Sequence, residues 1–139
     1  MLYQTILLAL DPADERSHRL LVKAGVIAEQ NNADLHVVYV EPGIGNNSFN
    51  DLEVELASFH DSEQFRKFEE LMALAKGTSY PIRAIHMSEG NVTKHLLKLI
   101  EELNANLVVF GKEHSFFSAI SGAESELRKH NSMDLLFIG

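Results

Sequence analysis

The chain has 139 residues and carries 12 Lys and Arg against 20 Asp and Glu, which gives a formal charge of −8. Such an acidic chain repels phosphate backbones, and no basic stripe interleaved with aromatic residues offsets this, so we expect no nucleic-acid binding. The absence of cysteine excludes disulfides, thiol chemistry and Cys-ligated metal sites. The length predicts one domain over residues 1–139.

Targeting and membrane signals are weak in this sequence. No apolar run approaches the ~20 residues that span a bilayer. The first five residues lack the positively charged start and the long apolar core of a signal peptide. We therefore expect a cytoplasmic protein that does not bind membranes.

The apolar residues alternate between two patterns along the chain. Short continuous runs, such as 6–10 before Asp11 and Pro12, are typical of strands buried on both faces of a sheet. Between these runs, apolar residues recur at helical spacing, most clearly over 92–103. The runs predict strands at 6–10, 35–40, 82–87, 107–110 and 133–138, and the helical spacings predict helices over 20–28, 52–75 and 92–103 and within 115–131. The first helix is expected to have an acidic first turn at 13–15 and to stop at Asn31-Asn32, and a turn is expected at 88–91 after the third strand.

Five strands alternating with four helices predict an α/β fold, a single doubly wound parallel sheet with right-handed crossovers and helices on both faces. The wholly apolar run 6–10 predicts the central strand, and the mixed polarity of 82–87 predicts an edge strand. An apolar last strand at the other edge would aggregate unless it is paired. Self-pairing predicts a homodimer through Met133, Leu135 and Phe137.

The turn after the fourth strand is the main functional feature of the sequence. Ligands of open α/β sheets bind outside the carboxyl ends of the strands, so a phosphate, if one is held, would lie at the turn from Gly111 to His114. His114 could sense pH there, or it is an ordinary exposed loop histidine. Asp11 either contacts a ligand or caps the following helix.

Catalytic and metal motifs do not emerge. None of the seven histidines forms a pair with metal-motif spacing. The serines between 115 and 125 lack a general base at matched spacing and a strained nucleophile turn. We expect no catalytic residues, no metal and no cofactor.

Four segments resemble the universal stress protein family over nearly the whole chain. They are ILLALD at 6–11, Gly90 before a helix, ANLVVFG at 105–111 and MDLLFI at 133–138. The resemblance implies a five-stranded parallel sheet in the order 3-2-1-4-5 and a homodimer joined through the last strand. It also implies a cytoplasmic role in stress resistance with no established catalytic reaction.

That family has an ATP-binding branch, whose loop contains a glycine, two residues, a second glycine, nine residues, and a third glycine followed by Ser or Thr. Here Gly111 supplies the first glycine, but His114 and Glu124 stand at the second and third positions, before Ser125. The segment 114–118 resembles instead the A-type branch, which lacks this loop. We therefore expect a non-enzymatic protein that acts through protein partners and binds ATP weakly or not at all. The alternative is an ATP-binding, slowly hydrolysing switch that uses Asp11, Gly111, His114 and Ser125.

Overall fold

A computed structural model gives the structure of this chain, and it describes residues 2–12, 15–42, 63–90, 92–111 and 133–138. No helix in these segments combines the length and the apolar character needed to cross a bilayer. The helices and strands described are β1 (Thr5–Ala9), α1 (Ser17–Asn31), β2 (Asp34–Pro42), α3 (Glu63–Lys76), β3 (Ala84–Gly90), α4 (Val92–Leu103), β4 (Leu107–Gly111) and β5 (Asp134–Ile138).

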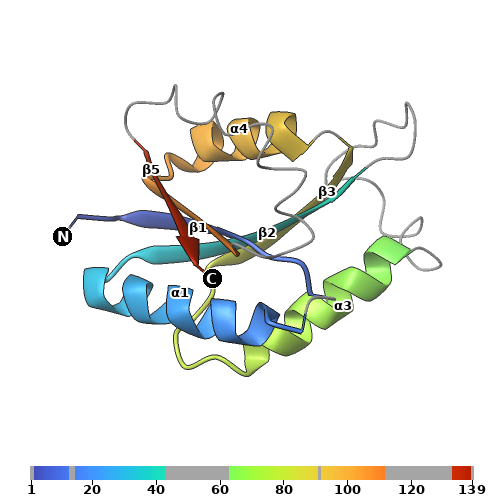
Figure 1. Ribbon diagram of the computed structural model, residues 1–139, viewed down its shortest axis with the longest axis horizontal. Coiled ribbons are helices and arrows are strands. Elements are labelled where there is room, and N and C mark those ends of the chain that lie inside the picture. Colours follow the sequence, from blue (N-terminus) through green and yellow to red (C-terminus); the bar gives the residue numbers. More distant parts are fainter. Residues whose placement is uncertain (1, 13–14, 43–62, 91, 112–132, 139) are drawn as a thin grey trace.

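The five strands form one parallel sheet in the order β3-β2-β1-β4-β5. Helices α1 and α3 cover one face of the sheet, and α4 covers the other (Figure 1). This confirms the predicted α/β fold, the strand order that the family resemblance implied, and the positions of the first strand at the centre and the third at an edge.

Strand β1 is central, because Ile6, Leu7 and Leu8 each have a buried register partner on both sides. Leu8 lies opposite Val37 of β2 and opposite Val109 of β4, and all three are essentially inaccessible to solvent. Successive side chains of a strand point to opposite faces, so β1 contributes side chains to the hydrophobic cores on both faces of the sheet. Leu8 packs in the core below α1 and α3, whereas Leu7 packs in the core below α4.

The end of α1 agrees with the sequence, but its beginning does not. Asn32 takes the left-handed conformation (φ 53°) that asparagine tolerates, and its N–H reaches the carbonyls of the last turn. The predicted acidic first turn is wrong, because α1 begins at Ser17 with no acidic residue in its first turn. Ser17 and Leu20 are buried, whereas Glu15 is exposed and lies in the preceding turn. Burial against the sheet, and not the helix dipole, sets the start.

Strand β3 also differs from its predicted bounds. The sequence placed a turn at 88–91, but β3 continues to Gly90 because Ser88, Glu89 and Gly90 pair in register with the last three residues of β2. Polar residues are tolerated in an edge strand, so the polar composition of 88–90 wrongly predicted the end of the strand. Of the predicted long helix 52–75, residues 63–75 lie in α3, while 52–62 and the last predicted helix lie outside the described residues.

Candidate functional site

The carboxyl ends of β1 and β4 form the edge of the sheet where a ligand is expected. These strands are parallel neighbours, and their continuations lead to opposite sides of the sheet, since β2 adjoins β1 and β5 adjoins β4. Such a reversal of strand order leaves a crevice outside the strand ends, the usual ligand position in open α/β sheets.

Asp11 and Gly111 come to this edge from strands that are far apart in the sequence. Asp11 follows β1 by two residues, Gly111 is the last residue of β4, and both are half-buried. Asp11 does not cap α1, because Arg16 holds the N-cap position and the cap makes no side-chain hydrogen bond. The capping interpretation of Asp11 is therefore wrong for this helix. A carboxylate at this edge can only accept hydrogen bonds when ionised, which suits hydroxyl or amino groups better than phosphate oxygens.

The remaining residues of the predicted nucleotide loop lie outside the described residues. These are His114 and Ser125, together with Lys112 in the predicted turn after Gly111 and Glu124 at the position of the third glycine. Where the chain is described, no group of three or more His, Cys, Asp and Glu side chains could hold a metal ion.

The second predicted site, the dimer edge, falls on β5. This strand pairs with β4 along one side and is last in the sheet order. Met133 is buried in the core below α4, and Leu135 and Phe137 pack against that core. Leu136, which the sequence did not single out, is 36% exposed. Buried and exposed residues alternate along an edge strand that is covered on one face, and this alternation could have identified Leu136 as exposed.

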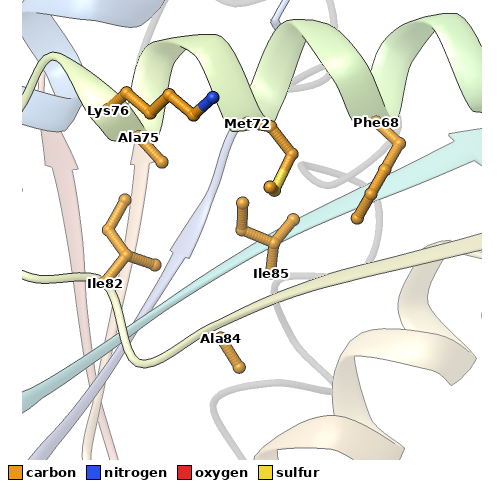
Figure 2. Close-up of a pocket in the computed structure, with 7 residues that line it drawn as sticks. All are labelled: Phe68, Met72, Ala75, Lys76, Ile82, Ala84 and Ile85. Carbon is orange, nitrogen blue, oxygen red and sulfur yellow. The ribbon is translucent and has the colours of Figure 1, made fainter.

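An apolar groove lies at the opposite edge of the sheet, between α3 and the segment that leads into β3. It encloses about 360 Å³. Figure 2 shows Phe68, Met72 and Ala75 pointing from α3 toward Ile82 and Ile85. Its described lining holds no histidine or carboxylate, so it offers packing surface and not catalytic groups. The lining is completed by Lys76 and Ala84.

Comparison with known proteins identifies the family. The family model described as "Universal stress protein family" matches residues 2–126. The chain belongs to the universal stress protein family. A universal stress protein A homolog of Pasteurella multocida is 27% identical over 137 residues, which cover 99% of this chain and 96% of that protein. Universal stress protein C of Salmonella typhi is 31% identical over 126 residues, covering 87% and 92% of the two chains.

Solved structures of universal stress proteins share the fold. One, determined in complex with cAMP, superposes with a TM-score of 0.63 at 17% identity and covers 100% of this chain and 99% of that chain. The protein from Archaeoglobus fulgidus in complex with dAMP gives a TM-score of 0.64 at 19% identity, with full coverage of both chains. At this identity, the likeness establishes the five-stranded α/β architecture of the family and no ligand.

Proposed function

We propose that this universal stress protein works in the stress response as a homodimer joined through β5, acting on protein partners and not by catalysis. The observation that carries the proposal is the position of β5 at the end of the sheet. Among the described strands its backbone pairs with β4 alone, and Leu136 of β5 is 36% exposed. An edge of this kind invites a further strand, and a second copy related by a two-fold axis closes the assembly. The cytoplasmic location expected from the sequence remains a prediction.

The dimer is tested by light scattering coupled to sizing chromatography at micromolar concentration. Wild type should have twice the mass of one chain, and Leu136→Lys should have the mass of one chain with its circular dichroism unchanged. Val26→Lys is the matched control, because Val26 is a 48% exposed apolar residue that belongs to α1 and not to β5. A monomeric wild type, or a dimer that survives Leu136→Lys as well as it survives Val26→Lys, would contradict the proposed interface.

Action through protein partners is tested separately, by affinity capture from stressed and unstressed cells. We expect a defined set of proteins to be retained by wild-type protein only after stress. Val26→Lys again serves as the surface control. Retention of the same proteins from both kinds of cells would count against a stress-specific partner.

Nucleotide binding is the second candidate function, and it is favoured by the placement of Asp11 and Gly111 at one strand-end crevice. Family members determined with cAMP and dAMP make adenine nucleotides the ligands to examine. Two glycines of the ATP loop are replaced, by His114 and Glu124, and glutamate brings a negative charge toward the phosphates. Losing two hydrogen bonds to charged oxygens weakens binding by about 3–6 kcal/mol.

Calorimetry at about pH 7.5, where an imidazole of ordinary pKa is mostly neutral, separates the two functions. From a micromolar starting site, we expect a dissociation constant for Mg-ATP of about 0.1 mM or weaker. Binding of Mg-ATP with a dissociation constant below about 10 µM would favour the ATP-switch function, provided that Asp11→Asn abolishes this binding. Titrations with cAMP and dAMP show whether a nucleotide with a single phosphate is accepted where ATP is not.

A further inference from the structure

Two histidines make a direct contact between the two strands at the β3 edge of the sheet. Nδ1 of His36 lies 3.0 Å from Nε2 of His86, and the rings stack with their centroids 5.2 Å apart at 26°. In the strand register, Val38 lies opposite His86, so His36 and His86 are diagonal neighbours on one face of the sheet. Val38 packs in the core below α4, which places the histidine pair on that face.

The number of protons on the two rings determines whether the hydrogen bond between them can form. A hydrogen bond between two ring nitrogens needs one N–H and one lone pair, which two neutral imidazoles provide. A single added proton leaves that bond intact, because the charged ring can donate to the neutral one. Once both rings are charged, two N–H groups face each other at the 3.0 Å contact between His36 and His86. The bond is then lost and two like charges repel at close range.

The surroundings of the histidine pair disfavour the doubly charged form. His36 is only 8% exposed. Burial lowers the pKa of His36, an effect that the charge of Asp34 opposes and the charge of Arg83 reinforces. Helix α4 packs on both strands from the same face, and it brings a half-buried imidazole together with exposed charges of both signs. These α4 groups are His95, Lys94, Lys98, Glu101 and Glu102.

We propose that His36 and His86 form a proton-sensitive contact, which ties the edge strand β3 to β2 near neutral pH and loosens it on acidification. The folded pair accepts one proton with its bond intact, whereas the unpaired rings accept two. Opening is therefore linked to the uptake of a proton. Its contribution to stability is fully present above pH ~6.5, the ordinary histidine value, and declines as the pH falls below that value.

Loosening β3 also affects the opposite face of the sheet. Met87 packs in the core below α1 and α3, and Ile85 packs against that core and lines the groove beside α3. Ile85 and Met87 are the chain neighbours of His86, so a displacement of β3 at His86 moves both of them. Acidification should therefore widen the apolar groove in Figure 2 and raise its exposure to solvent.

Amide hydrogen exchange of β3, corrected for intrinsic exchange rates, measures the opening directly. Between about pH 7.5 and about pH 5.5, uptake of one proton should raise the opening constant of β3 about tenfold. The double variant His36→Asn/His86→Gln keeps polar atoms near the positions of Nδ1 and Nε2 but cannot titrate, so its opening constant should change far less. The control His18→Gln removes an exposed histidine of α1 and should behave as wild type.

Side-chain NMR of the wild-type histidines gives an independent readout should the double variant fail to fold. We expect His36 and His86 to titrate as a coupled pair, with the second proton binding well below pH ~6.5. Independent titration of both rings at the ordinary value, or an equal change of β3 opening in wild type and double variant, would overturn the proposal. Tight binding of one Zn²⁺ by both rings, detected by adding the metal alone, would also overturn it in favour of a metal site.

Discussion

Phe110 of β4 and Phe137 of β5 stack as register partners, with ring centroids 5.2 Å apart and 20° between the planes. Phe110 is 1% exposed, and Phe137 packs against the core that contains it. The last strand is therefore anchored by a side-chain contact within the same chain. Substitutions at Phe137 report on folding, whereas Leu136 is the better probe of association.

Truncation of one ring of this pair should destabilise the folded chain. Phe137→Ala removes a half-buried ring and its stacking contact with Phe110, so we expect a loss of about 2–4 kcal/mol in the free energy of unfolding. Urea denaturation checks this value. Phe137→Leu, which fills much of the space, should lose clearly less, and equal losses for the two variants would show that the ring is not packed as described.

A charge at the centre of the sheet should prevent folding. Leu8 is wholly buried between β2 and β4, and Leu8→Asp would place an unpaired carboxylate in that position. We expect insoluble protein, or a chain without cooperative thermal unfolding in circular dichroism. The control Leu2→Asp changes an 82% exposed leucine and should fold normally. A folded Leu8→Asp protein would contradict the central position of β1.

Asn106 connects the starts of three strands. Its side-chain Oδ1 accepts hydrogen bonds from the backbone N–H groups of Gln4 and Thr5, both at 3.1 Å, and its carbonyl accepts one from Asp134 at 3.0 Å. Asn106→Ala removes the two side-chain bonds and should cost about 1–2 kcal/mol in thermal or urea unfolding. Asn106→Asp retains the acceptor and should recover part of that loss. No recovery would indicate that the acceptor is unimportant.

The pair formed by Tyr3 and Asp134 predicts a loss of stability at alkaline pH. The phenol of Tyr3 donates to Oδ2 of Asp134 at 2.9 Å. This bond raises the pKa of Tyr3, and burial and the negative charge of Asp134 add to the effect. A raised value means that the contribution is present below pH ~10 and is lost as the pH rises through the value of the folded state.

Melting temperatures between about pH 9 and pH 11 should therefore fall more steeply for wild type than for Tyr3→Phe. Asp134→Asn removes the carboxylate charge that helps to raise the pKa of Tyr3, and it should also flatten the profile. Near neutrality, both variants should differ little from wild type, since the pair is exposed. Parallel profiles for the three proteins would contradict the linkage.

The sequence predicts the elements whose burial is complete and misplaces those whose limits depend on a partner. Continuous apolar runs located β1 and β4, because a strand covered on both faces has no polar positions to obscure it. The end of β3 was missed, since Ser88 to Gly90 join the sheet through backbone pairing with β2, which composition does not encode. The start of α1 was missed for a related reason, because burial against the sheet set it.

The same distinction applies to the sites. Asp11 and Gly111 were predictable because strand order alone brings the ends of β1 and β4 together. His36 and His86 are 50 residues apart, and their contact depends on the register and diagonal geometry of β2 and β3. No local pattern reports that register, so the histidine pair emerges only from the folded structure.

The central position of β1 also determines the order in which the protein can be completed during synthesis. Thr5 and Asn106, which are hydrogen-bonded, are 101 residues apart, so β1 leaves the ribosome long before its partner β4 exists. Until then β1 can pair only with β2, and the apolar surface around Leu7 lacks its cover from α4. The nascent chain therefore exposes an incomplete sheet with an uncovered apolar face for most of its translation. This is the state that ribosome-associated chaperones would bind.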